Sequence, residues 1–300
     1  MKNLCKLFVI AMILLCAATS CEKEGVYNPK QKISRIYYSA EIKDHGETFN
    51  TDKLLKEEWN WNGNLLESIT YYNDEGNQAA VETYEYDGKR LAAIHCGYNN
   101  KYVFNYDGKR LASVDFYNGE SMVQTAEVIH DGKKITGLNV TEWVNDLYPE
   151  ALPMRTSVLR FILPNLSEQA ASQLLAQIRQ ANEKMCDLHY SFLFEWEGNN
   201  ISKITEIGLA STQVFEYTYD NMKNPFNGLF DINELEFYSL CASENNALSE
   251  TLHLADTLIA GEYTYTYDGK YPATRSWTHT NAYDFGNEYS ETYTYYYEYK

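Results

Sequence analysis

The sequence YDGKRLA occurs twice, beginning at Tyr86 and again at Tyr106, and both copies belong to a longer series of similar units. In each unit an alternating aromatic segment leads to a polar residue and a glycine, and two aliphatic residues three positions apart follow. The units are EWNWNGNLLESI, ETYEYDGKRLAAI, VFNYDGKRLASV, EVIHDGKKITGL, LFEWEGNNISKI and YTYTYDGKYPAT, with a degenerate copy, FEYTYDNMKN. Asp-Gly or Asn-Gly between alternating segments predicts a β-hairpin with a type I′ turn, followed by solvated basic residues.

The spacing of the units predicts how the hairpins connect. The first four glycines are 25, 20 and 24 residues apart, and the linkers YNDEGN, GYNN and YNGE are rich in turn-forming residues. Successive hairpins therefore join as an antiparallel meander of about 12–15 strands. We expect a mainly β domain over residues 33–300, a large curved sheet resembling a partly open barrel.

The alternation within each strand separates two faces. Tyr263, Tyr265 and Tyr267 share one face of their strand, because side chains alternate along a strand. The aliphatic pairs do not follow this rule, since Leu91 and Ile94 are an odd number of residues apart. Either each hairpin contains a β-bulge, or the sheet is covered on both sides.

The repeat is interrupted between Leu138 and Ser191. Within this gap, NLSEQAASQLLAQIRQANEKMCDL has apolar residues every three or four positions and begins with an Asn-x-x-Glu capping box. The pattern predicts one inserted amphipathic α-helix over about residues 165–188, lying on the sheet or inside its curl. A second break, over residues 223–250, predicts a long loop with a short helical piece.

The N-terminus has the layout of an export signal over residues 1–20, with lysines, an apolar run and small residues. The apolar run is short for a membrane span, which needs about 20 residues. The small residues lead to Cys21, which resembles the lipobox of bacterial lipoproteins, where a signal peptidase cuts before a cysteine that carries diacylglycerol. We expect lipidation at Cys21, a tether over residues 21–32, and a place on the outer membrane, at its periplasmic or surface-exposed face. An ordinary secretory signal with an incidental cysteine is the alternative.

The charge of the chain limits its partners. It has 25 Lys and Arg against 42 Asp and Glu, and a net charge of −17 that becomes −19 without residues 1–20. Such a chain repels nucleic acid and anionic membrane, so we expect no nucleic-acid partner and a membrane contact through the lipid anchor only. The cysteines at 96, 186 and 241 form no disulfide framework, and whether two of them pair stays open.

Several segments resemble known families. YEYDGKRL and FNYDGKRL are similar to the Tyr-Asp repeats of Rhs-type proteins, which build shells from serial hairpins. The lipobox, the hairpins, YDNMKNPFNGL at residues 219–229, SENN at 243–246 and YTYTYDGKYPAT at 263–274 together resemble a group of secreted Bacteroidetes lipoproteins with a domain of unknown function. This resemblance implies a porin-like antiparallel fold and no particular activity.

Motifs that would carry chemistry are missing from the sequence. The six histidines lack metal-ligand spacing, and no nucleophile elbow, phosphate loop or dinucleotide fingerprint occurs. Paired carboxylates such as Glu195 and Glu197 would suit a glycosidase, but with 42 acidic residues such pairs arise by chance. We therefore predict no enzyme, no catalytic residue, no metal site and no cofactor.

Aromatic residues are the feature that most suggests binding. Five tryptophans could form a platform on which a sugar stacks: Trp59, Trp61, Trp143, Trp196 and Trp277. Alternatively they complete a half-exposed sheet, which we favour because they fall at strand positions that the repeat already requires.

Two functional hypotheses follow. The first is a non-catalytic surface binding or scaffold protein with a glycan or protein ligand. The second is a carrier of an apolar or lipid-like molecule in the curl of the sheet, where the helix would dock. A membrane-spanning barrel is disfavoured, because neither face offers a continuous aliphatic band toward lipid.

Overall fold

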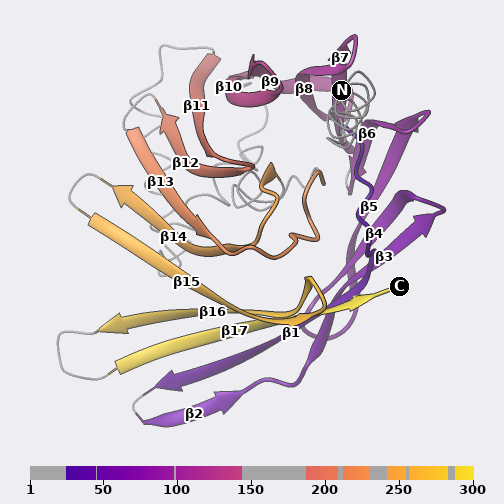
Figure 1. Ribbon diagram of the computed structural model, residues 1–300. Helices are drawn as coiled ribbons and strands as arrows, with labels where there is room; N and C mark the ends of the chain where they lie inside the picture. Colours follow the sequence, from indigo (N-terminus) through magenta and orange to yellow (C-terminus); the bar gives the residue numbers. More distant parts are fainter. Residues whose placement is uncertain are drawn as a thin grey trace, which may run out of the picture.

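The chain folds into a closed antiparallel β-barrel (Figure 1). The computed structural model describes residues 25–44, 46–97, 99–143, 187–208, 212–229, 242–254, 257–282 and 288–300. The strands are β1 (Ile33–Asp44), β2 (Glu47–Asn50), β3 (Leu54–Asn62), β4 (Leu65–Tyr72), β5 (Gln78–Asp87), β6 (Arg90–Cys96), β7 (Asn100–Asp107), β8 (Arg110–Asn118), β9 (Ser121–Asp131), β10 (Lys134–Trp143), β11 (Asp187–Glu197), β12 (Asn200–Ile207), β13 (Thr212–Tyr219), β14 (Ala247–Leu254), β15 (Thr257–Asp268), β16 (Tyr271–Ala282) and β17 (Glu288–Tyr299).

The ring closes where the first strand meets the last. β1 pairs with β17 from Ile33↔Tyr299 to Lys43↔Ser290, and on its other side with β2 and β3. Because β2 and β3 pair with successive parts of β1, they share one of sixteen positions around the ring. The prediction of a partly open sheet of about 12–15 strands is therefore wrong. Closure removes both edge strands, whose unpaired backbone groups are a liability, and no local hairpin pattern encodes it.

The described part of the predicted helix, residues 187–188, is a β-strand and not a helix. Residues 144–186, which hold most of the expected helix over 165–188, lie outside the described residues. Asp187, inside the predicted helix, pairs with Trp143 and extends the β10–β11 ladder. The described barrel is thus built from strands and their connections. Among these residues no helix is long and apolar enough to cross a membrane.

Each hairpin turn uses glycine in a way that the sequence did not predict. Asp87 pairs with Arg90, so the loop consists of Gly88 and Lys89. Gly88 has φ +65°, whereas no lysine in the described chain has a positive φ. A positive φ at the first loop residue alone is the pattern of a type II′ turn, not of the predicted type I′. The aspartate is the last strand residue and not part of the loop.

A β-bulge in each such hairpin explains the odd spacing of the aliphatic residues. Tyr86 pairs with Leu91 but Glu85 pairs with Ala93, so Ala92 has no partner across the ladder. Leu91 and Ile94 consequently both point inward, with 5% and 0% of their surfaces exposed. The same register shift occurs in β3–β4, β7–β8, β9–β10, β11–β12 and β15–β16. The bulge, one of the two predicted alternatives, is confirmed.

The two faces of the barrel differ in polarity. The inner face holds two clusters of buried apolar and aromatic residues, one around Trp59 and Ile94 and one around Phe194 and Ile204. The outer face is mostly polar, and hydroxyl pairs link neighbouring strands across it: Thr266–Thr274 at 2.7 Å, Ser276–Thr294 at 2.9 Å and Thr278–Thr292 at 3.0 Å.

The barrel has two unlike ends. We call one end the hairpin end; it holds residues 25–32, Lys300, residues 220–229 and 242–246 between β13 and β14, and the turns at Gly63, Gly88, Gly108, Gly132, Gly198 and Gly269 (Figure 1). We call the other the far end, where β10 ends at Trp143, β11 begins at Asp187, and Gly97 and the turns at 73–77 and 119–120 lie. The strands alternate in direction around the ring, so every turn of one kind falls at the same end.

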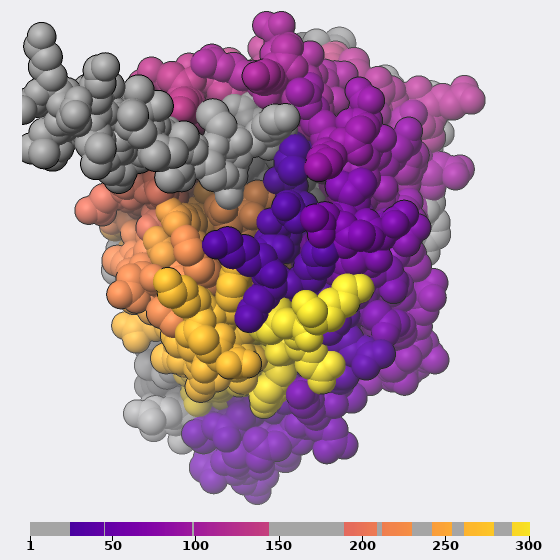
Figure 2. All heavy atoms as spheres, turned by 45° about the vertical axis from the view of Figure 1, so that its right-hand side comes forward, coloured from indigo at the N-terminus to yellow at the C-terminus, as the bar shows by residue number. Residues whose placement is uncertain are grey.

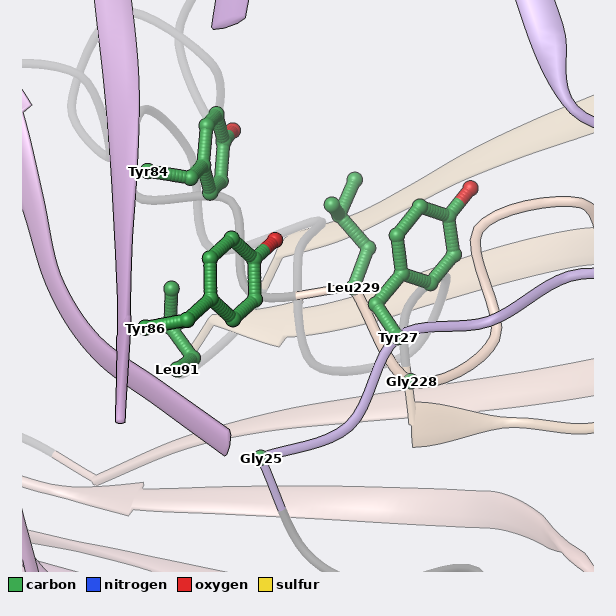
Figure 3. Close-up of a pocket in the computed structure, with 7 residues that line it drawn as sticks. All are labelled: Gly25, Tyr27, Tyr84, Tyr86, Leu91, Gly228 and Leu229. Carbon is green, nitrogen blue, oxygen red and sulfur yellow. The ribbon is translucent and has the colours of Figure 1, made fainter. Parts of the chain in front are cut away.

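Side chains pack closely at the hairpin end. Residues 25–32 lie between the hairpins of the N-terminal half and the gold segments of the C-terminal half (Figure 2). The Tyr27 hydroxyl donates to the Pro225 carbonyl at 2.7 Å, and Phe226 packs against Trp59 with ring centroids 6.2 Å apart. Leu229 faces the inner wall of β5 and β6 in Figure 3, around a cavity of about 10 Å³. That volume holds about one water molecule, so this end is filled.

The second basic residue after each glycine joins neighbouring hairpins. Arg90 donates from Nη1 to the Gly108 carbonyl at 2.9 Å and lies over the Tyr106 ring at 4.5 Å. Arg110 donates to Gly132 at 2.8 Å in the same way. The prediction that both bases after the turn are merely solvated is therefore wrong for these two arginines.

Candidate functional site

A stack of three aromatic rings lies on the inner wall toward the far end. Tyr38 of β1 is stacked with Tyr293 of β17, with ring centroids 5.8 Å apart and planes at 21°. Trp277, on the strand at the other side of β17, is stacked on Tyr293 at 5.6 Å and 15°. All three rings are half-buried, so part of the stack remains accessible. They form a row of stacked rings that spans three strands.

Neighbouring residues hold this surface in place. The Arg275 guanidinium lies 5.5 Å from the ring centroid of Tyr263 and 4.8 Å from that of Tyr295, within range of cation–π attraction. Gly261 provides room for the indole, because a Cβ there would lie 2.8 Å from Nε1 of Trp277. A larger residue at 261 would displace the tryptophan.

Carboxylates accept hydrogen bonds from aromatic side chains at several places on the inner wall. The pairs are Trp59–Glu57 at 2.7 Å, Tyr71–Glu82 at 2.9 Å, Tyr263–Glu250 at 3.3 Å and Tyr293–Glu291 at 2.6 Å. Glu82 and Glu250 are only 3% and 6% exposed, and buried carboxylates require such donors. The inner wall thus combines flat rings, carboxylate acceptors and one guanidinium, groups that orient a hydroxyl-rich ligand.

The segments YDNMKNPFNGL and SENN form a polar clasp at the hairpin end. Asp220 accepts from the backbone N–H of Met222 at 2.9 Å and of Asn246 at 3.0 Å, and the Tyr267 hydroxyl also donates to it. Burial, together with this bond to Asp220, raises the pKa of Tyr267. Asn224 donates to the Ser243 carbonyl at 3.0 Å. The clasp holds the β13–β14 connection in the barrel mouth, so we interpret it as structural.

The tryptophans do not form one platform. Trp59 and Trp61 stack at 6.4 Å in the packed half, and Trp61 donates to the Ile33 carbonyl at 2.8 Å. Trp196 of β11 donates to the Ile135 carbonyl of β10 at 2.8 Å and so links these two strands. Of the five, Trp277 alone joins the aromatic stack; Trp143 ends β10 at the far end. Tyrosines supply the rest of the stacking surface.

The other residues considered from the sequence are dispersed. Glu195 and Glu197 are exposed on the outer face, and Glu195 pairs with Lys203 at 2.7 Å. The described residues contain no cluster of His, Cys, Asp and Glu that could hold a metal ion. Cys96 is half-buried at the end of β6, whereas Cys21, Cys186 and Cys241 lie outside the described residues, so lipidation and pairing stay predictions.

Sequence reasoning missed Tyr38, Tyr293 and Arg275 as site residues. The alternation in YTYYYEY predicts that alternate tyrosines share a face, but not which strands lie beside it. The site forms only when β1 closes against β17 and β16, and that pairing has no local signature. Gly261 was the one local clue, since a glycine inside a strand indicates close approach of another group.

Comparisons with known proteins support the fold. No family model and no curated protein matches the chain. A porin-like protein from Bacteroides uniformis is similar in structure, with a TM-score of 0.52 at 12% identity over 92% of this chain and 100% of the other. A porin-like protein from Bacteroides vulgatus aligns over 90% of this chain and 99% of the other with 9% identity. Its TM-score of 0.27 is too low to support a conclusion about the fold. The porin-like antiparallel fold expected from the resemblance is confirmed, and the identity is too low to indicate function.

Proposed function

We propose that this protein is a lipid-anchored, non-catalytic binding protein of the cell envelope, held at the outer membrane by Cys21, with its barrel in water. The polarity of the two faces supports this proposal. A membrane-spanning barrel presents an apolar band outward and a polar interior. Here hydroxyl pairs such as Thr266–Thr274 lie on the outside of β15–β17, and the apolar clusters are inside.

The ligand that suits the inner wall best is a glycan. The observation that carries this choice is the stack of Tyr38, Tyr293 and Trp277 beside Arg275. Sugar rings present C–H groups that pack on aromatic faces, and their hydroxyls donate to carboxylates such as Glu291. Aromatic rings with a few placed polar groups are the usual lining of a ligand site.

An apolar cargo fits the structure less well. The carrier hypothesis requires a hollow lined by aliphatic residues. The apolar half of the interior is instead filled by residues 25–32 and 224–229, around a cavity of about 10 Å³. That cavity is too small for a lipid chain.

Binding can be tested with a glycan panel. A ligand that binds only the folded state raises the melting temperature. We expect a subset of glycans to do so, and Trp277→Ala to abolish the shift. Trp143→Ala is the matched control, because Trp143 also lies at the far end but outside the stack. Binding by Trp277→Ala at wild-type strength, or shifts with lipids and none with glycans, would overturn the glycan assignment.

Anchoring can be tested separately. We expect cells that express the chain to attach labelled palmitate to it, and Cys21→Ala to remove the label. A wild-type chain that carries no label would contradict the lipid anchor without bearing on glycan binding.

A further inference from the structure

The hairpin end carries basic residues despite the net charge of −17. Three consecutive hairpins, β5–β6, β7–β8 and β9–β10, each place two basic residues and one aspartate at this end. Arg90 and Arg110 bond to the next hairpin, but Lys89, Lys109 and Lys133 are exposed. We call these three lysines the lysine rim. The sequence repeat thus concentrates positive charge on one sector of one end.

The N-terminal segment reaches the barrel beside this sector. The Gly25 carbonyl accepts a hydrogen bond from the Leu91 backbone N–H at 2.8 Å, one residue after Arg90. Gly25 and Tyr27 are both buried, so the segment is fixed to the hairpin end and does not hang from it.

Chain length then limits how far Cys21 can lie from the lysine rim. Gly25 is four positions after Cys21, and an extended chain spans about 3.5 Å per residue, so the two residues lie within about 14 Å. A lipid on Cys21 therefore holds the hairpin end, and not the far end, against the bilayer. This step rests on the lipid anchor of the proposed function.

We propose that the hairpin end docks on an anionic lipid surface through Lys89, Lys109 and Lys133. Each lysine near such a surface adds attraction that falls off within a Debye length of about 8 Å at physiological salt. The short tether allows the rim to come within that range of the bilayer. The far end, with the aromatic stack, then faces away from the membrane.

The proposal extends the expectation that the lipid alone holds the protein to the membrane. A net negative charge repels anionic lipid at a distance, but the local charge decides the contact once the anchor has brought one end close. The turns at the far end are acidic instead, with Asp74, Glu75 and Glu120 exposed there. The two ends therefore differ in their attraction to anionic lipid.

Lysine footprinting on the anchored full chain tests the docking. The lipidated protein is reconstituted into phosphatidylcholine vesicles with or without phosphatidylglycerol, and lysine acetylation is measured by mass spectrometry. We expect the rim lysines to react about fivefold more slowly on anionic vesicles, the effect of one charge near the surface. Lys43 and Lys53, toward the far end, serve as controls and should react equally on both. About 1 M salt should remove the difference, because it shortens the Debye length to about 3 Å.

Charge variants of the rim provide the second measurement. It is the acetylation of Lys30, an exposed lysine at the same end. K89E/K109E/K133E should lose the protection of Lys30 on anionic vesicles, and K89R/K109R/K133R should keep it. A wild-type chain that floats with the vesicles but shows equal acetylation of rim and control lysines overturns the docking alone. A chain that does not float overturns the anchor, and the docking with it.

Discussion

The two ends of the barrel are built from the same strands but differ in what fills them. At the hairpin end, apolar side chains and buried backbone from residues 25–32 surround a cavity of about 10 Å³. Toward the far end, the inner wall carries half-buried rings and carboxylates such as Glu291. The difference indicates that stability and recognition are separated along the barrel axis.

The largest effect should follow from a cavity in the packed half. Leu66 is 0% exposed beside the turn of β3–β4, and Leu66→Ala should cost about 2–5 kcal/mol of unfolding free energy. Met122, near a far-end turn, is 40% exposed, and Met122→Ala should change it by less than about 0.5 kcal/mol. Urea denaturation measures both losses, provided that the dependence of the unfolding free energy on urea concentration is the same for each variant. Equal losses would contradict the contrast between the ends.

A smaller effect should separate two turn glycines that differ in φ, Gly108 at the hairpin end and Gly97 at the far end. Gly108, in a hairpin turn, has φ +59°, and Gly108→Ala should cost about 1–2 kcal/mol through backbone strain. Gly97, in a far-end turn, has no positive φ, so Gly97→Ala should be neutral or stabilising by about 0.4–1 kcal/mol. Neither position has an atom within 4 Å of an added Cβ, so differences in packing do not enter. Thermal unfolding of both variants decides the point; a neutral Gly108→Ala would refute the turn assignment.

The next smaller effect should come from losing a contact that joins neighbouring hairpins. Arg90→Ala removes a bond to Gly108 and the contact with Tyr106, and should cost about 1 kcal/mol. The adjacent Lys89→Ala should stay within about 0.5 kcal/mol, because Lys89 is exposed. If both variants unfolded at the same urea concentration, Arg90 would have no joining role.

The smallest effect should be a pH dependence of the stability that Glu244 contributes to the clasp. Hydrogen bonds from Lys223 and then Asn199 lower the pKa of Glu244 below its ordinary 4.5. A lowered folded-state pKa means that this stabilisation is fully present above pH 4.5 and is lost as the pH falls below it. Glu244→Gln should therefore melt below wild type at pH 7, and the gap should close in acid. The gain is small because the pair is partly exposed. A gap that is constant with pH would exclude Glu244 as its source.

The sequence predicted local features well and long-range ones poorly. Alternation and spacing identified the hairpins, the common face of alternate tyrosines and the bulge as one of two ways to place Leu91 and Ile94. The turn type was wrong because the two-residue loop is Gly88-Lys89, so that Asp87 pairs with Arg90 as the last strand residue. Closure of the ring, and with it the stack of Tyr38 on Tyr293, was missed because it depends on strands at opposite ends of the chain. Residues 25–32, expected as a tether, contain the buried Tyr27, whose contacts with Trp59 and Pro225 likewise leave no local pattern.

The seam between β1 and β17 sets the order in which the chain can fold. Each of the other neighbouring pairs joins strands consecutive in sequence, except where β1 meets β3 beyond the short β2. The sheet can therefore grow hairpin by hairpin, but it keeps two open edges until the last strand is made. Such edges template aggregation, and sequence-distant pairing slows folding. A chain truncated before Glu288 would lack β17, the strand that pairs with β1 from Ile33 to Lys43. The barrel would then stay open, so its closure depends on the last strand to be made.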